Sequence, residues 1–102
     1  MERRAHPRIN RPLEGWHGTS GAKQCRIVDL SLGGCFVQTF ALPRRGEQTA
    51  ITLNLESGLA SFPAEVVYVM TGMGFGVRFV EMTPELTAQL QGLIESLLAT
   101  TD

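Results

Sequence analysis

The sequence lacks the features of membrane-spanning, secreted and metal-binding proteins. It has no apolar run long enough to cross a bilayer, and its polar, arginine-rich start has no apolar segment behind it as a signal peptide would. The two cysteines, Cys25 and Cys35, show neither a CxxC spacing nor a nearby histidine pair, so no zinc site or redox motif is indicated. We therefore expect a cytoplasmic protein with no metal, no cofactor and no membrane partner. Its cysteines are expected to be buried free thiols, although a disulfide between paired strands stays geometrically open.

Catalytic groups are equally sparse. The two histidines, His6 and His17, both lie in or next to the N-terminal lead-in. No spacing in the chain pairs a nucleophile with a base or one carboxylate with another. We expect that the protein is not an enzyme.

The charge is low overall but unevenly distributed. Apolar residues make up 43% of the 102 positions and charged residues only 19%, which suits a single folded domain over residues 1–102. Residues 1–11 carry a net charge of +3, whereas the remaining residues carry −4. An acidic body without a basic, aromatic stripe argues against a nucleic-acid-binding barrel. A short basic segment favours one compact anionic partner over a long polyanion.

Alternating apolar and polar residues predict an all-β domain over residues 12–81, after a flexible arginine-rich segment at 1–11. The stretch TAITLNL, for example, should place Ile51, Leu53 and Leu55 inward. Pro63 should mark an edge or a bulge. This pattern predicts a small antiparallel barrel or sandwich. The expected strands are 13–17, 23–30, 35–40, 49–55, 60–70 and 75–82.

The last segment changes to a helical period and predicts one amphipathic helix over residues 83–99. Thr83 suits the N-cap, Pro84 the first helical position, and Glu85 the first turn, where the helix dipole favours an anion. Leucine and isoleucine then recur on one face, which we expect to pack against the strands.

Two short stretches carry the functional hypothesis: RRAHPR at residues 3–8 and DLSLGG at residues 29–34. Taken singly, the first is typical of a solvated terminus and the second of a hairpin turn in which Gly33 and Gly34 permit positive φ angles. Together they form RxxxR followed about twenty residues later by DxSxxG. This pair resembles the signature of the PilZ domain family, and the resemblance extends over essentially the whole chain, including GVRF and the closing helix.

The resemblance implies a six-stranded β-barrel that binds cyclic di-GMP, a bacterial second messenger, and signals to an unidentified downstream protein. Arg4 and Arg8 match the family's two arginines, whose guanidinium forks suit a phosphate or the O6/N7 edge of a guanine. Arg3 makes the motif RRxxxR, which in the family accompanies binding of an intercalated ligand dimer.

The second motif supplies the remaining expected ligand contacts. Asp29 carries over as the acceptor for guanine N–H donors, and Ser31 as a hydroxyl that reaches phosphate or base. Gly34 matches the motif glycine, and Gly33 is a weaker candidate beside it. Tyr68 lies where many relatives carry an aromatic residue that stacks on a guanine, with ordinary packing as the alternative. The alternative function is a ligand-independent PilZ adaptor that acts through protein contacts, although adaptors usually lose these motif residues.

Overall fold

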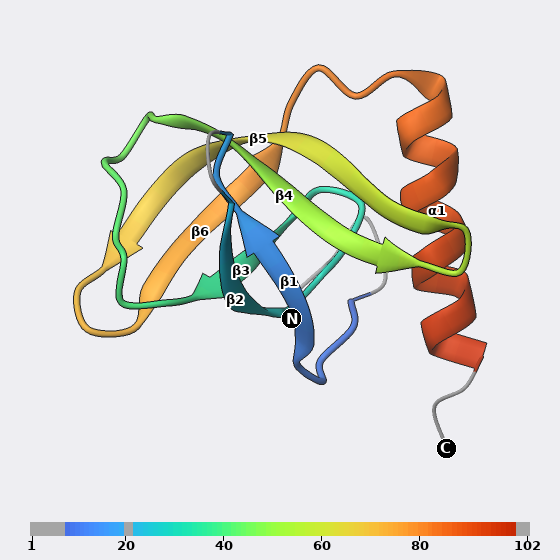
Figure 1. The fold of residues 1–102 in the computed structure, drawn as a ribbon, viewed down its shortest axis with the longest axis horizontal. Helices are drawn as coiled ribbons and strands as arrows, with labels where there is room; N and C mark the ends of the chain where they lie inside the picture. The colour runs from blue at the N-terminus through green and yellow to red at the C-terminus, as the bar shows by residue number, and fades with distance from the viewer. Residues whose placement is uncertain (1–7, 20–21, 100–102) are drawn as a thin grey trace, which may run out of the picture.

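The structure, a computed structural model, describes residues 8–19 and 22–99, which form six strands and one helix (Figure 1). The expected helix and strands are all present, with ends within a few residues of those predicted. The elements are β1 (Leu13–His17), β2 (Lys23–Val28), β3 (Gly34–Gln38), β4 (Gln48–Leu55), β5 (Gly58–Met70), β6 (Gly74–Phe79) and α1 (Pro84–Ala99).

The strands close into a barrel in the order β1-β2-β3-β6-β5-β4, with every neighbouring pair antiparallel. Pairing of β1 with β4, through residues such as Gly15 and Leu53, completes the ring. The predicted six-stranded barrel with a C-terminal helix is therefore confirmed, and the sandwich is excluded.

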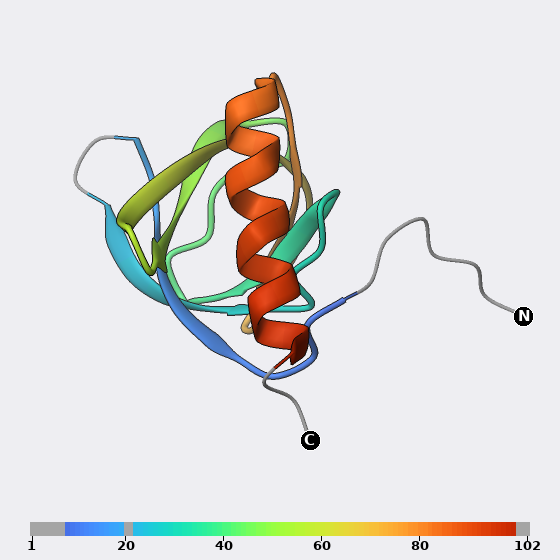
Figure 2. The ribbon, with the colours of Figure 1, turned by 90° about the vertical axis from the view of Figure 1, so that its right-hand side faces the viewer.

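Antiparallel pairing gives the barrel two distinct ends. The starts of β1, β3 and β5 and the ends of β2, β4 and β6 share one end, and α1 lies across it (Figure 2). We call this the helix end. The opposite end, which we call the far end, carries the β1–β2, β3–β4 and β5–β6 connections.

The interior is filled by side chains at alternating strand positions. On β4, Ile51 and Leu53 are buried and the residue between them is more exposed, as the sequence pattern predicted; Thr49 is buried too, whereas Leu55, also expected inward, is only half-buried. The buried apolar core comprises Ile9, Ile27, Leu30, Cys35, Val37, Ile51, Leu53, Phe62, Ala64, Val66, Phe75, Val77, Leu90 and Ile94.

A register shift in β5 interrupts this alternation. It lies between Val66, which pairs with Val77, and Tyr68, which pairs with Gly76. One extra residue there moves Tyr68 to the outer surface. The expectation of an edge at Pro63 was wrong, because a closed barrel has no edge strand, and the bulge lies several residues further along.

Helix α1 begins where the sequence predicted. The Thr83 hydroxyl accepts a hydrogen bond from the Leu86 amide at 3.1 Å, which satisfies one of the amides left unpaired at a helix start. Leu90 and Ile94 are the buried residues of the helix and cover the helix end of the barrel. Within the described residues, no helix has the length and hydropathy needed to traverse a bilayer.

The described start of the chain is held at the helix end. Ile9 is buried and its amide donates to the Leu30 carbonyl at 2.8 Å, while Arg11 donates to the Leu97 carbonyl in the last turn of α1 at 3.3 Å. A cation at a helix C-terminus is favourable for the helix dipole. The expected flexible segment at 1–11 thus contains an anchored residue, Ile9, and residues 1–7 lie outside the described range.

Both cysteines are free thiols, as the sequence predicted. Cys35 is fully enclosed in the core and Cys25 is half-buried. Burial raises the pKa of Cys25 to about 11, and burial followed by the neighbouring Cys25 raises the pKa of Cys35 further still. The thiolate, which is the reactive form, is therefore suppressed at both positions.

We predict that Leu90→Ala destabilises the protein by ~2–5 kcal/mol, because it leaves a cavity between α1 and the barrel. Thermal and urea unfolding measure this loss. Leu98→Ala is the matched control, since Leu98 lies on the same helix but is 39% exposed, and its effect should be below ~1 kcal/mol. Equal losses for the two variants would contradict the packing described for α1.

We also predict that the thiols resist alkylation in the folded protein. With the Cys25 pKa at about 11 instead of 9.0, the thiolate fraction at mildly alkaline pH falls ~100-fold. Iodoacetamide labelling followed by mass spectrometry should therefore be at least that much slower in buffer than in urea. Similar rates in the two solvents would show that the thiols are accessible in the native state.

Candidate ligand-binding site

The DLSLGG motif forms the connection between β2 and β3 at the helix end. Asp29, the first residue after β2, has a φ of 54° and an exposed side chain. Aspartate tolerates this left-handed conformation better than most residues because its short side chain bonds locally. Gly33 and Gly34, expected to permit positive φ angles, do not adopt them. The left-handed conformation in this connection is therefore at Asp29, and the Ser31–Gly34 segment turns the chain into β3.

Hydrogen bonds within the turn and one from β6 fix its conformation. The Ser31 amide donates to the Gly34 carbonyl at 2.9 Å, and the Gly33 amide donates to the Ser31 hydroxyl at 3.2 Å. The Phe79 amide at the end of β6 donates to the Gly33 carbonyl at 2.9 Å. Leu30, within the turn, is completely buried. The turn is therefore a rigid corner in which Ser31, Gly33 and Gly34 are held by hydrogen bonds, while the Asp29 side chain is exposed.

The arginine segment meets this corner through the bridge between Ile9 and Leu30. The bridge is antiparallel, so the residue before Ile9 lies opposite the residue after Leu30. Arg8, which is exposed, is thereby placed opposite Ser31. The structure therefore places the backbone of the second motif arginine beside the DxSxxG turn. Arg3 and Arg4 lie outside the described residues.

The two motif glycines serve the structure differently. A Cβ added at Gly34 would lie 2.1 Å from the Val77 carbonyl oxygen and 3.0 Å from the Arg78 Cα. Gly34 is therefore required for the close approach of β3 to β6, whether or not a ligand binds. A Cβ at Gly33 would meet only the Ser31 hydroxyl, at 3.8 Å. Gly33 is the motif glycine that leaves open space at the surface.

Strand pairing adds Arg78 to this surface, a residue that the sequence favoured only as a strand-surface charge. Arg78 pairs with Gly34 in the β3–β6 register, and its guanidinium donates to the Glu65 carboxylate at 2.8 Å. Its side chain is 62% exposed, so it remains accessible beside the motif turn. The alternation of GVRF predicts that Arg78 points outward, but only the pairing of β3 with β6 places it next to Gly34.

Tyr68 lies farther from the turn than the other candidates. Its ring covers Gly76 and stacks against Phe36, with ring centroids 6.1 Å apart, because Gly76 has no side chain to separate them. Phe36 follows Gly34 by two residues on the same face of β3, whereas Tyr68 is two strands away. This places Tyr68 roughly 12 Å from Gly34 by strand spacings. Phe36, which the sequence did not single out, is the nearer aromatic ring.

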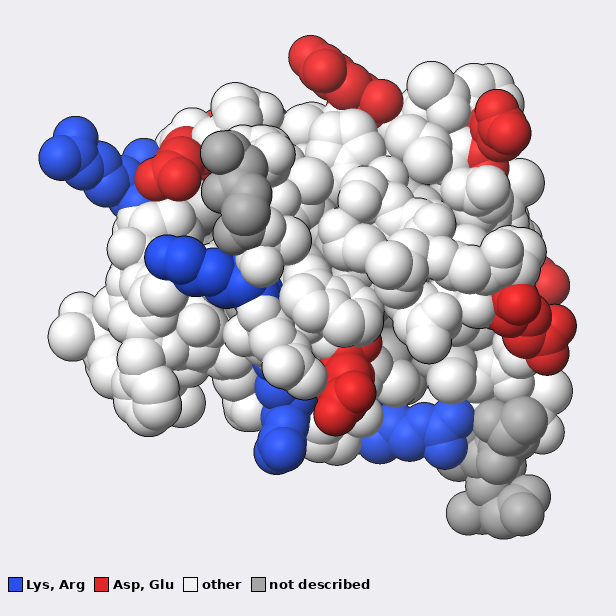
Figure 3. Space-filling view, viewed as in Figure 1, with Lys and Arg blue, Asp and Glu red and all other residues white. Residues whose placement is uncertain are grey.

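The charges on the described surface are mixed. In Figure 3 basic side chains lie at the left and along the lower edge with acidic side chains beside them, and further acidic side chains lie at the top and on the right. Within the described ranges, no group of three or more His, Cys, Asp or Glu side chains could hold a metal ion. Among the described residues, the motif turn has the cations Arg8 and Arg78 beside it and the anion Asp29 within it, and Glu65 pairs with Arg78.

The architecture defines the class of protein: a closed six-stranded antiparallel barrel with a helix over one end and a motif turn at that end. The sequence matches the family model of the PilZ domain over residues 2–96. The chain therefore belongs to the PilZ domain family, as its two motifs predicted. A search of curated protein sequences gave no match.

Solved structures of the same fold include complexes with a nucleotide. The PilZ domain of YcgR from Escherichia coli with c-di-GMP is 25% identical, with a TM-score of 0.76 over 96% of this chain and 93% of that one. The longer YcgR structure in complex with c-di-GMP is 27% identical, with a TM-score of 0.73 over 96% of this chain and 47% of that one.

More distant structures agree in fold alone. The K. pneumonia MrkH–c-di-GMP complex is 17% identical, with a TM-score of 0.75 over 97% of this chain and 54% of that one. The Bacillus subtilis motility inhibitor MotI is 18% identical, with the same TM-score over 99% of this chain and 54% of that one. The chain thus spans about half the length of these larger proteins.

We predict opposite outcomes for alanine at the two motif glycines. Gly34→Ala should cost ~1–3 kcal/mol of stability, because the new methyl group meets the β6 backbone. Gly33→Ala should change stability by less than ~0.5 kcal/mol, since its Cβ enters open space without a positive φ. Urea unfolding of both variants tests the pair, and a larger loss at Gly33 would contradict the geometry of the turn.

Proposed function

We propose that this protein is a cyclic di-GMP receptor that acts by binding and not by catalysis. The observation that carries the proposal is the Ile9–Leu30 bridge, which joins the arginine segment to the rigid DxSxxG turn. The 25% identical YcgR domain, which was solved with c-di-GMP, supports the same ligand. Since the ligand is an intracellular messenger, the proposal also requires a cytoplasmic location.

The arginines supply charge-assisted contacts to the ligand. Arg8, opposite Ser31, and Arg4, four residues earlier, present guanidinium forks to phosphate oxygens or to the O6/N7 edge of a guanine. A four-residue stretch spans at most ~14 Å, so both arginines can act on one ligand at the turn. Arg3 would supply the additional positive charge that an intercalated ligand dimer requires.

The motif turn supplies the complementary surface. The exposed carboxylate of Asp29 accepts from the N–H donors of a guanine, which no cation could do. The Ser31 hydroxyl offers a contact to phosphate or base, and the open space at Gly33 lets the ligand approach the backbone. Gly34 acts by holding β3 against β6. Tyr68 takes part only if the ligand extends over Phe36 and Gly76, as a dimer would.

The proposed signal is the ordering of the arginine segment over the turn. Residues before Ile9 would fold onto the ligand, while Ile9 itself is already anchored. Ordering costs ~1–2 kcal/mol of backbone entropy per residue. The segment therefore folds over the turn only when its contacts with a bound anion contribute a larger favourable free energy. The closed segment presents a changed surface to a downstream protein.

We predict that Arg4→Ala weakens cyclic di-GMP binding by about tenfold or more, since each charge-assisted contact contributes ~1.5–3 kcal/mol. Isothermal titration calorimetry measures the affinity. Arg45→Ala is the matched control, because Arg45 is an exposed arginine in the β3–β4 connection at the far end. Arg3→Ala should lower the ligand-to-protein ratio from about two to about one.

Position 29 offers a second test that avoids backbone strain. Asp29→Gly removes the carboxylate and suits the φ of 54°, whereas Asp29→Asn keeps one acceptor oxygen and also tolerates that angle. Binding should be lost in the glycine variant and retained in part by the asparagine variant, with unchanged circular dichroism. A wild-type protein that gives no heat with cyclic di-GMP would favour the ligand-independent adaptor.

A further inference from the structure

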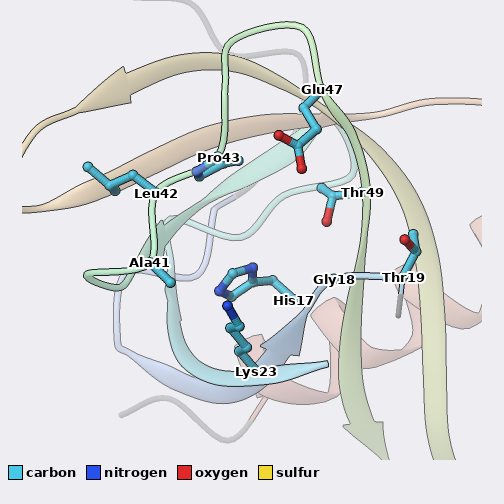
Figure 4. Close-up of a pocket in the computed structure, with 9 residues that line it drawn as sticks. All are labelled: His17, Gly18, Thr19, Lys23, Ala41, Leu42, Pro43, Glu47 and Thr49. Carbon is cyan, nitrogen blue, oxygen red and sulfur yellow. The ribbon is translucent and has the colours of Figure 1, made fainter. Parts of the chain in front are cut away.

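A polar cavity lies at the far end of the barrel, away from the motif turn. It has a volume of about 460 Å³, within the range of small-molecule sites (Figure 4). It opens between the end of β1, the start of β2 and the connection from β3 to β4. Its lining residues are His17, Gly18, Thr19, Lys23, Ala41, Leu42, Pro43, Glu47 and Thr49.

This cavity holds the buried polar side chains of the domain. Among the described residues only His17 and Thr49 are polar and buried, each 8% exposed, and both line it. His17 Nε2 is shielded from solvent and has no hydrogen-bond partner. The imidazole is held by edge-on packing against Phe75, with ring centroids 5.2 Å apart. A buried nitrogen without a partner costs free energy, and a bound polar group would relieve that cost.

One cation and one anion complete the lining. Lys23 pairs with His17 in the β1–β2 register, and Glu47 precedes β4. In Figure 4 the Lys23 and Glu47 side chains lie on opposite sides of the His17 imidazole. Glu47 is fixed, because its Oε1 accepts from the Arg44 amide at 3.0 Å and its carbonyl accepts from the Val66 amide at 2.9 Å.

The imidazole between these charges is neutral at neutral pH. Burial and then the Lys23 ammonium lower the pKa of His17, while Glu47 opposes them. A neutral imidazole can donate from one nitrogen and accept at the other, and the Thr49 hydroxyl can do both. The cavity therefore offers one positive wall, one negative wall and two neutral polar groups between them.

We propose that this far-end cavity binds a small zwitterion of the free α-amino acid class. The ligand carboxylate lies toward Lys23 and the His17 imidazole, and the ligand ammonium lies toward Glu47. Thr49 adds a hydroxyl contact, and the apolar residues Ala41, Leu42 and Pro43 line the cavity beside the ligand side chain.

Other ligand classes match the lining less well. A phosphate or nucleotide would meet the Glu47 carboxylate, and the site has a single lysine to offset it. An apolar ligand would leave His17 Nε2 and the Thr49 hydroxyl without partners. The cyclic di-GMP site proposed above is at the helix end, so this inference does not depend on it.

The test uses the wild-type protein and pools of the free L-amino acids. The His17 imidazole is observed by nitrogen-15 NMR while each pool is added. One pool should shift the Nε2 resonance, and the shift should reach a plateau as the amino-acid concentration rises. For the active amino acid, the methyl ester, which lacks the carboxylate, and the N-acetyl form, which lacks the ammonium, should each bind at least about tenfold more weakly.

Two variants test whether the charged side chains of Lys23 and Glu47 bind the ligand, and a third variant serves as their control. Lys23→Gln and Glu47→Gln should each weaken binding about tenfold, and the glutamine at position 47 keeps an oxygen for the Arg44 amide. Arg26→Gln is the matched control, because Arg26 is an exposed cation on the same strand as Lys23 and does not line the cavity. It should bind as the wild type does.

Three results would overturn the proposal. The first is that no pool moves the His17 resonance, which would mean that the cavity holds water only. The second is that the ester and the N-acetyl form bind as well as the parent amino acid. The third is that Arg26→Gln weakens binding as much as Lys23→Gln. Cyclic di-GMP titrations of the same variants should match the wild type, which keeps a failure here distinct from a failure of the receptor proposal.

Discussion

The proposed receptor depends on one backbone contact, the bridge between Ile9 and Leu30. Both side chains are buried in the core, so the contact is stabilised by apolar burial as well as by its hydrogen bond. It fixes the point at which the N-terminal segment joins the barrel. Without it, the arginines and the DxSxxG turn would be two unrelated surface features. With it, Arg8 lies opposite Ser31, so a ligand bound by Arg8 would also lie against the motif turn.

The two ends of the barrel have different chemistry because each strand reverses direction relative to its neighbours. The helix end is covered by Leu90 and Ile94, and its motif turn carries an exposed acid beside exposed arginines. The far end has no helix over it among the described residues, and its cavity combines the buried His17 and Thr49 with the exposed Lys23 and Glu47. The two proposed sites therefore have no residue in common.

Local patterns predicted most of the fold. The helix start at Thr83 and the alternation in β4 depend on neighbouring residues, which the sequence shows directly. The motif residues were likewise visible as spacings. The closure of the barrel and the position of Arg78 beside Gly34 depend on which strands pair, and nothing local encodes that. The far-end cavity escaped prediction for the same reason, since it joins residues from β1, β2, β4 and a loop. The burial of Ile9 was not predicted either, because the residues on both sides of it, Arg8 and Asn10, are polar.

The bulge in β5 bears on how related sequences are compared. Val66 points inward before it and Val69 packs against the core after it, so the strand has two inward phases separated by an odd step. A homologue lacking that single residue would alternate strictly, and the counterparts of Tyr68 and Val69 would still point outward and inward, as they do here. Such a homologue aligned without a gap would have its inward residues matched to Tyr68 and Met70. A one-residue gap placed at the bulge is therefore what keeps the inner and outer faces of the two strands in phase up to the next turn.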